Sequence, residues 1–310
     1  MGVSLRASLW LLLLSAIWGS SYLFITIALG SVGPAFVAFS RTAGAALMLA
    51  PLLWRHRAAL AGRWHLVPVA AAFQMAIPLM LISMGEQTVD SGLTGILIAS
   101  QPMWLVLLLV VSGQGRPRVM SLAGIAVGLA GVAVLLGGPG VGAHLRGAGL
   151  IVGAALSYAV GVIVVRRLMP GVDAIALTAA NVTAAAVLLA PFALADLPTA
   201  APSAEGLGAL IVLAVVCTAA GFLIYNRLIV AVSGQFASLV AFLSPPFAVG
   251  YGALALGEPV GPPTLLGLVL VLAGSWACAR WSSRPNQEAA AVAVAPTARS
   301  ASALRPPART

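Results

Sequence analysis

The chain has 310 residues, of which 61% are hydrophobic and 7% are charged. A soluble domain carries about 25% charged residues, so these charges are too few to cover a water-facing surface, and a soluble globular protein is excluded. All 16 basic residues are arginines, and without lysine neither a Walker A phosphate loop nor a Schiff-base lysine is available. Cys217 and Cys278 lie in apolar runs and offer neither a disulfide framework nor a zinc site. The composition predicts a polytopic membrane protein.

A helix crosses the hydrocarbon core in about 20 apolar residues. The first such run follows Arg6 and resembles a signal peptide, but nine further runs and the lack of a small-residue cleavage site favour a retained first helix. The ten expected spans are 8–28, 34–54, 66–85, 91–112, 119–137, 147–167, 174–195, 206–227, 234–256 and 263–281.

The loops between these spans differ in charge from one side of the membrane to the other. Eleven arginines fall on the side of the N-terminus: Arg6, Arg55, Arg57, Arg63, Arg116, Arg118, Arg166, Arg167, Arg227, Arg280 and Arg284. The opposite side has Arg146 and five carboxylates, Glu86, Asp90, Asp196, Glu205 and Glu258. Since arginine concentrates in cytoplasmic loops, both termini are predicted to be cytoplasmic, with 282–310 as a disordered tail. This topology explains the net charge of +9 without nucleic acid, and membrane lipids are the expected partners.

The two halves of the chain resemble each other at an offset of about 140 to 144 residues. Ser91-Gly92 aligns with Ser233-Gly234, and Pro102 with Pro245-Pro246. The aligned units, 8–137 and 147–281, hold five spans each, and an odd number inverts the second copy in the membrane. Inverted repeats are typical of secondary transporters, which bind substrate near the midplane between the copies. A duplicated scaffold protein is the alternative. The predicted fold class is an all-α integral membrane protein of ten helices in two inverted five-helix repeats.

The same segments resemble a known family. LLLLSAIWGSSYLFITIAL near the N-terminus, MGEQTVDSGLTGILIASQP from Met84, and LALGEPVGPPTLLGLVLVLAGSW in the second half are similar to the EamA family of the drug/metabolite transporter superfamily. The resemblance covers about residues 8–281. It implies a carrier that moves small organic solutes by alternating access, often for export. One departure is Gln114, where family repeats often have glutamate.

Arg41 is the clearest functional candidate, because a charge at the bilayer centre costs about 2.5–3.5 kcal/mol on insertion scales. It lies seven residues beyond Pro34, about 10 Å below the outer end of its helix at about 1.5 Å per residue. As a functional residue, Arg41 would be an outer gate or an anchor for an anionic substrate. As a structural residue, it would pair with Glu86, if the two helices are neighbours, or extend its side chain outward to the headgroups by snorkelling. Glu86 is either a coupling group or a solvated helix end. Glu258 is either a loop residue or a substrate contact.

Other polar and aromatic residues within the spans either line a substrate cavity or have structural roles. Asn181 is the repeat partner of Arg41, and Trp18 that of Tyr158. Mid-span prolines free backbone carbonyls and mark central sites in transporters, although a packing kink is the alternative; Pro78 adds a similar break. The predicted cavity residues are Trp18, Tyr22, Arg41, Gln74, Ser100, Gln101, Tyr158, Asn181, Tyr225, Asn226 and Ser244. The gating or coupling candidates are Glu86, Pro102, Pro245 and Glu258.

These features favour a secondary transporter of a small organic metabolite, with an amino acid or related solute as the preferred substrate and export preferred over uptake. The alternative is a non-transporting membrane sensor or scaffold protein. An enzyme is not expected, because the three histidines, His56, His65 and His144, lie in predicted loops. Neither a metal nor another cofactor is predicted, and the patterns do not distinguish a monomer from a homodimer. The composition, rich in Ala, Gly, Arg and Pro, suggests a bacterial cytoplasmic membrane.

Overall fold

The computed structural model describes residues 5–113, 119–137 and 145–281. Gln114 and the predicted tail at 282–310 lie outside these ranges. Within them the chain is helical, and ten helices are long and apolar enough to cross a membrane. The ten predicted spans are therefore confirmed. They are Leu5–Leu29, Pro34–Leu60, Trp64–Gly85, Ser91–Val111, Val119–Leu136, Leu145–Leu168, Ala174–Ala195, Ala204–Ala231, Phe236–Leu256 and Pro262–Arg280.

Six of the spans are built on one main helix each, and four are interrupted. The main helices are α1 (Leu5–Leu29), α2 (Pro34–His56), α7 (Val119–Leu136), α8 (Leu145–Leu168), α9 (Ala174–Ala195) and α14 (Pro262–Trp281). The third span contains η2 (Trp64–Leu66), α3 (Val67–Ala71), η3 (Ala72–Ala76) and α4 (Ile77–Gly85), after η1 (Arg57–Leu60) ends the second. The fourth contains α5 (Ser91–Ile98) and α6 (Gln101–Val111). The eighth contains α10 (Ala204–Val212), η5 (Leu213–Ala220) and α11 (Gly221–Ala231), and the ninth follows α12 (Gly234–Ser238) with α13 (Val240–Leu256).

The interruptions test the role expected of the prolines. Pro102 lies in the first turn of α6, directly after the break between α5 and α6, and Pro78 lies in the first turn of α4, after the π-helical turn η3. These two breaks agree with the prediction. The equivalent break expected at Pro245-Pro246 is wrong, because α13 continues through both prolines and the chain breaks earlier, at Leu239. The second π-helical segment, η5, contains no proline and was not expected.

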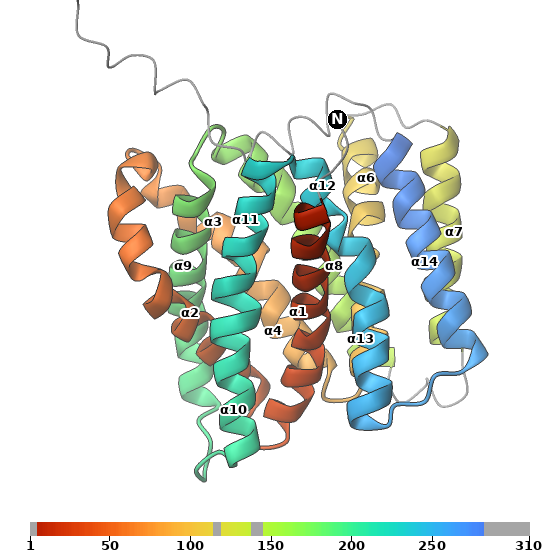
Figure 1. Ribbon diagram of the computed structural model, residues 1–310, viewed down its shortest axis with the longest axis horizontal. Coiled ribbons are helices and arrows are strands. Elements are labelled where there is room, and N and C mark those ends of the chain that lie inside the picture. Colours follow the sequence, from red (N-terminus) through yellow and green to blue (C-terminus); the bar gives the residue numbers. More distant parts are fainter. Residues whose placement is uncertain (1–4, 114–118, 138–144, 282–310) are drawn as a thin grey trace, which may run out of the picture.

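The helices form a flattened bundle (Figure 1). The pair α2–α9 lies at one end of its long axis and the pair α7–α14 at the other, with α1, α4 and α8 between them. Packing between the two halves is reciprocal. Helix α1 packs on α13 as α8 packs on α5 and α6, and α2 packs on η5 as α9 packs on η3. This reciprocity is consistent with the pseudo-two-fold axis that two inverted repeats require.

Glycines bring α7 and α14 into close contact. A Cβ added at Gly274 would lie 2.5 Å from the backbone oxygen of Gly124, and one at Gly131 would lie 2.8 Å from the backbone nitrogen of Val271. Small residues allow membrane helices to approach closely enough for backbone packing. Gly124, Gly131 and Gly274 therefore allow the backbones of α7 and α14 to pack against each other.

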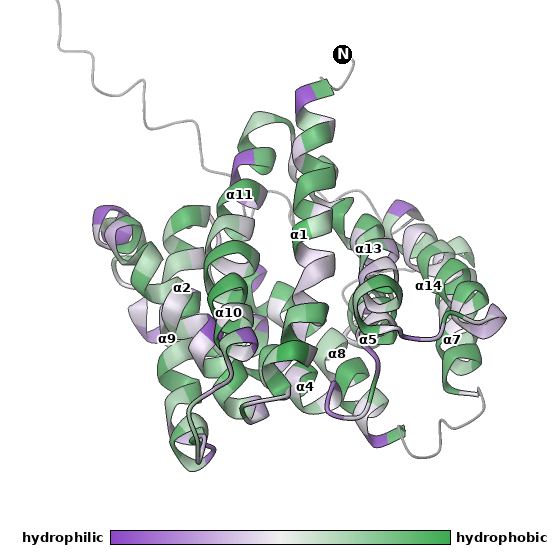
Figure 2. Ribbon diagram, turned by 60° about the horizontal axis from the view of Figure 1, so that its bottom comes forward, coloured by the Kyte–Doolittle hydropathy of each residue, from purple (hydrophilic) through white to green (hydrophobic). Residues whose placement is uncertain are grey.

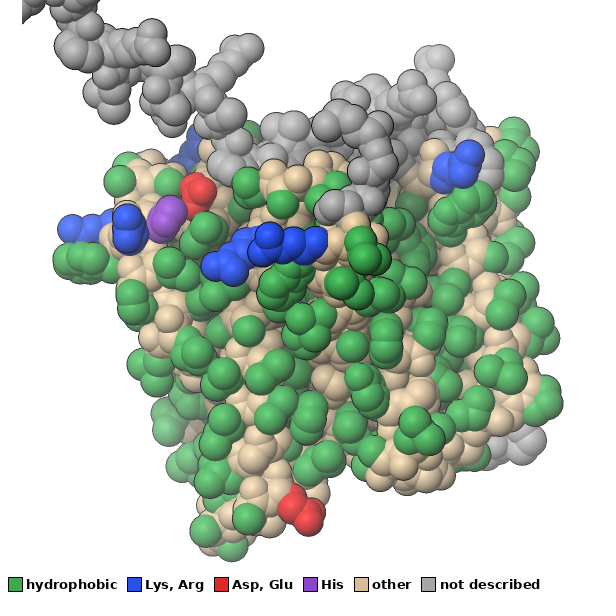
Figure 3. All heavy atoms as spheres, in the orientation of Figure 1, with side chains coloured by type: hydrophobic (Ala, Val, Ile, Leu, Met, Phe, Trp, Pro, Cys, Tyr) green, Lys and Arg blue, Asp and Glu red, His purple; other side chains and the backbone are tan. Residues whose placement is uncertain are grey.

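The surface of the bundle suits a lipid environment. Large hydrophobic side chains are exposed along the helices, and hydrophilic residues gather toward helix ends and loops (Figure 2). In the view of Figure 3 the arginines gather at one end of the bundle. At that end His56 Nδ1 lies 3.2 Å from Asp173 Oδ1, which also accepts a hydrogen bond from the backbone N–H of Ala176. The charge asymmetry of the loops is therefore also an asymmetry of the folded molecule.

Candidate functional site

Arg41 on α2 is one of two buried charged groups among the described residues, and it is 8% exposed. Its Nε donates a hydrogen bond of 2.8 Å to Oγ1 of Thr218. Thr218 lies in the π-helical segment η5, and its hydroxyl in turn donates to the carbonyl of Leu213, five residues earlier. The wide turn of η5 therefore supplies the hydroxyl that positions the guanidinium, as π-helical turns often do at functional sites.

Glu86 is the second buried charge, directly after the last residue of α4 and 6% exposed. Its Oε2 accepts a hydrogen bond of 3.2 Å from Oγ1 of Thr26 on α1. Its Oε1 is buried without a hydrogen-bond partner in the described part of the chain. Of the two alternatives for Glu86, the solvated helix end is wrong, because Thr26 of α1 and Ile151 of α8 lie against the end of α4 and the side chain is buried.

Arg41 and Glu86 are close enough to interact electrostatically, but they do not form an ion pair within 4.0 Å. Among the described residues, the contact of that kind is between His56 and Asp173. The direct structural pair considered from the sequence is therefore absent from this conformation. Each charge is held by a threonine from another helix. A buried carboxylate oxygen without a partner is costly, which makes it a candidate for binding a ligand or a proton.

Two tyrosines border these charges. Tyr22 on α1 lies within electrostatic range of Glu86 and Arg41, and Tyr158 on α8 lies within that range of Arg41. Tyr22 also lies against α5, where a Cβ added at Gly95 would be 3.4 Å from its ring. We refer to Tyr22, Thr26, Arg41, Glu86, Tyr158 and Thr218 as the polar cluster. Three of its members come from the first two helices, and the others come from helices of both halves.

Trp18 on α1 also contacts η5. Its Nε1 donates to the carbonyl of Cys217 at 3.2 Å, and its ring packs on Phe222 and Tyr225 with centroids 5.5 and 5.3 Å away. Gly221 leaves the space for this indole, since a Cβ there would lie 2.6 Å from Nε1. Consecutive residues of η5, Cys217 and Thr218, therefore bind Trp18 and Arg41.

Several predicted cavity residues have other surroundings. Ser100 donates to the carbonyl of Leu97 and accepts from Nε1 of Trp104, so its hydroxyl stabilises the break between α5 and α6. Asn226 donates to Oγ1 of Thr178 at 3.3 Å, which ties α11 to α9. These two residues have structural partners.

The remaining polar candidates lie at helix contacts or breaks. Gln74 packs on α8 at Gly161, where a Cβ would be 2.7 Å from its Cγ. Asn181 is 1% exposed, and its Oδ1 has no partner among the described residues. Gln101 is half-buried at the start of α6, and the carbonyl of Ser244 faces α1 at Gly19.

Glu258 has a clear structural role. Its Oε1 and Oε2 accept hydrogen bonds of 2.7 and 2.9 Å from the backbone N–H groups of Ser91 and Gly92. The carboxylate therefore caps the N-terminus of α5, where exposed N–H groups favour negative charge. Asp196 does the same for α2, accepting from the N–H of Ala35 at 2.9 Å. Of the alternatives considered for Glu258, the structure therefore shows a structural loop residue, which caps a helix of the other half of the chain.

Sequence reasoning missed Thr26, Thr218 and the segment η5. A single threonine in an apolar run is weak evidence, because its hydroxyl can bond within its own helix. Thr218 stands between Cys217 and a run of small residues, and no proline marks the π-helical turn. The available signal was that Thr218 is the one hydroxyl residue between Gly206 and Gly221.

The fold and the cluster together define a class: a multi-pass helical membrane protein that encloses an arginine and a glutamate among hydroxyl and aromatic groups. Ionisable residues buried inside a bundle of membrane-spanning helices are rare and typically functional. The described residues contain no group of three His, Cys, Asp or Glu side chains able to hold a metal ion.

Comparison with known proteins identifies the family. The model of the EamA-like transporter family matches residues 5–137 and 145–279. The chain belongs to the EamA-like transporter family, and thereby to the drug/metabolite transporter superfamily.

Curated relatives and a solved structure agree with this assignment. The chain is 30% identical to "Uncharacterized inner membrane transporter YedA" of Escherichia coli (strain K12), over 83% of this chain and 85% of the relative. It is 26% identical to "Uncharacterized transporter YvbV" of Bacillus subtilis (strain 168), over 93% and 96%. It is also 26% identical to "Probable terminal-alkyne amino-acid exporter" of Streptantibioticus cattleyicolor, over 88% and 93%. A crystal structure that is 21% identical has the same fold, with a TM-score of 0.62 over 88% of this chain and 96% of that chain.

Proposed function

We propose that this transporter exports an amino acid or a related zwitterionic metabolite by alternating access, and that the polar cluster binds the substrate. The observation that carries the proposal is that the buried Arg41 guanidinium has hydrogen-bond donors left for a ligand. Its Nε–Thr218 bond uses one of the five N–H donors of a guanidinium, and Glu86 is not bound to it. A substrate carboxylate pairs well with such a planar fork of donors.

Glu86 supplies the complementary charge. Its unpartnered Oε1 is suited to accept a hydrogen bond from a substrate ammonium, while Thr26 holds Oε2. Tyr22, near both charges, and Tyr158, near Arg41, would supply aromatic contacts for the rest of the solute. The Streptantibioticus relative, which is named as a probable amino-acid exporter, supports the same substrate class and direction.

A binding screen with matched ligands tests this proposal. The purified protein is heated with a neutral L-amino acid, with the amine that lacks its carboxylate, and with the acid that lacks its amino group. Since a hydrogen bond to a charged group is worth about 1.5–3 kcal/mol, we expect each analogue to bind about tenfold or more weakly than the amino acid. Equal stabilisation by all three would contradict recognition of both charges. No stabilisation by any amino acid, together with no flux, would favour a sensor or scaffold protein.

We also propose that both termini face the cytoplasm of a bacterial cell. The support is the concentration of arginines at one end of the bundle (Figure 3) and the tendency of such residues to stay in the cytoplasm. A cysteine at the exposed position of Glu205 should react with an impermeant thiol reagent added to intact cells, and one at the exposed position of Arg55 should not. The reverse pattern would contradict the orientation.

A further inference from the structure

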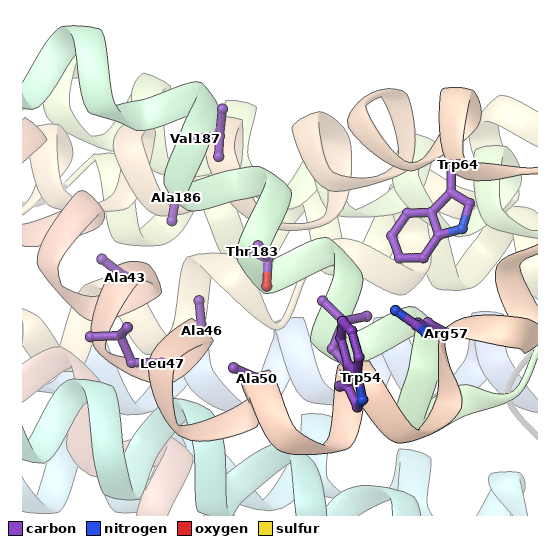
Figure 4. A pocket seen from close by; sticks show the side chains of 11 residues that line it. Ala43, Ala46, Leu47, Ala50, Trp54, Arg57, Trp64, Thr183, Ala186 and Val187 are labelled. Carbon is purple, nitrogen blue, oxygen red and sulfur yellow. The ribbon is translucent and has the colours of Figure 1, made fainter.

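A groove of about 630 Å³ opens on the membrane-facing side of the pair α2–α9, away from the polar cluster. Alanines of α2 and residues of α9 line its length, and Trp54, Arg57 and Trp64 lie together at one end (Figure 4). From Ala43 to Arg57 the groove follows α2 for about 21 Å, at about 1.5 Å per residue. That length exceeds half the thickness of a hydrocarbon core of about 30 Å.

The body of the groove suits a hydrocarbon chain. Its hydroxyl residue, Thr183, donates to the carbonyl of Ala179 in its own helix at 2.8 Å. Small side chains such as Ala46 and Ala50 form one wall, while Leu47 and Val187 project beside it and are strongly exposed. An apolar slot that opens toward the bilayer is complementary in shape and polarity to an acyl chain.

The end of the groove suits an anionic headgroup. The guanidinium carbon of Arg57 lies 3.6 Å from the ring centroid of Trp54, which fixes its plane by a cation–π contact and leaves its N–H edges available to phosphate oxygens. Trp54 and Trp64 are both exposed, as expected of aromatic residues at the headgroup level. Arg57 lies at the end of α2 where Arg55 is also exposed.

We propose that this groove is a specific site for one anionic phospholipid, with an acyl chain along α2 and α9 and the phosphate at Arg57. Basic pockets between membrane helices at the cytoplasmic side bind anionic headgroups, and charge complementarity selects this occupant over a zwitterionic lipid. The site does not depend on the transported substrate, and its readout does not use transport.

Tryptophan quenching by brominated lipids tests the proposal. The protein is reconstituted in phosphatidylcholine vesicles with increasing fractions of chain-brominated phosphatidylglycerol or chain-brominated phosphatidylcholine. The difference between the wild type and Trp54→Phe isolates the signal at the groove. We expect half-maximal quenching of Trp54 at an about fivefold lower fraction of the brominated phosphatidylglycerol, a preference that Arg57→Ala abolishes.

Two further variants separate the site from general membrane attraction. Ala50→Leu fills the slot at an exposed position and should reduce quenching of Trp54 by either lipid. Arg280→Ala removes a similar pair, in which the guanidinium carbon lies 5.0 Å from the Trp276 ring, and should keep the preference. Retention of the preference in Arg57→Ala, or full quenching in Ala50→Leu, would overturn the proposal. Disulfide crosslinking of two copies through Ala50→Cys would assign the groove to a dimer interface and would also overturn it.

Discussion

The pairs α2–α9 and α7–α14 join equivalent helices of the two halves, yet they differ in chemistry. In α7–α14 the backbones meet through Gly124 and Gly274, and no charged side chain occurs before Arg280 near the end of α14. In α2–α9 the contact includes alanines such as Ala38 and Ala185, and each helix also buries a polar group, Arg41 and Asn181. The same pairing therefore serves as a scaffold at one end of the bundle and carries a polar site at the other.

The pair α2–α9 is itself asymmetric. Arg41 and Asn181 occupy equivalent positions, but Arg41 is charged and bound to Thr218, whereas Oδ1 of Asn181 has no described partner. Glu86, the other buried charge, also belongs to the first half. The two halves thus pack in a similar frame, while the buried charges Arg41 and Glu86 both lie in the first half and make the charge distribution directional.

Removal of the Arg41 charge should give the largest effect. We expect Arg41→Gln to weaken binding of the preferred amino acid about tenfold to a hundredfold, because hydrogen bonds to charged groups are worth about 1.5–3 kcal/mol. Ligand-dependent thermal stabilisation measures the change. Arg63→Gln is the matched control, since Arg63 donates to the carbonyl of Pro170 at an end of the bundle and its loss should leave binding unchanged. Equal weakening by both variants would remove the distinction between site and scaffold.

Overpacking of α7–α14 should affect stability and not binding. Gly274→Leu forces a side chain against the backbone of Gly124 and Gly128, and such changes cost about 1–3 kcal/mol. We expect a lower midpoint of thermal unfolding in detergent with unchanged ligand affinity for the folded fraction. Gly149→Leu on α8 is the control, because a Cβ there meets nothing within 4 Å. A tolerated Gly274→Leu would show that the pair is not a close-packed scaffold.

The helix cap formed by Glu258 should give the smallest effect. Glu258→Ala leaves the N–H groups of Ser91 and Gly92 without their carboxylate, and loss of an N-terminal cap costs about 0.5–2 kcal/mol. The midpoint of thermal unfolding should fall, while Glu205→Ala, at an exposed carboxylate in the first turn of α10, should change it less. Loss of ligand binding without loss of stability would instead support the substrate contact first considered for Glu258.

Much of the fold was predictable, because long apolar runs and the arginines at their ends act locally or through composition. The ten spans follow from such signals. Glu86 was harder to interpret, since its burial depends on how α1 and α8 enclose the end of α4.

The partners of the buried charges were not predictable. Thr26 and Thr218 reach Glu86 and Arg41 from helices distant in sequence, and η5 widens its turn without a proline. The expected break at Pro245 failed because the helix begins at Val240, before the prolines. Hydrogen bonds between helices depend on tertiary packing, which a single chain's local pattern does not encode.

The central claim is that Arg41 binds the substrate of a transporter. Its most direct test is efflux of a labelled neutral L-amino acid from proteoliposomes that contain the wild type, Arg41→Gln or no protein. The account predicts that the wild type releases the label faster than protein-free vesicles and that folded Arg41→Gln releases it at the protein-free rate. Wild-type release at the protein-free rate for every amino acid, or release by Arg41→Gln equal to the wild type, would contradict it.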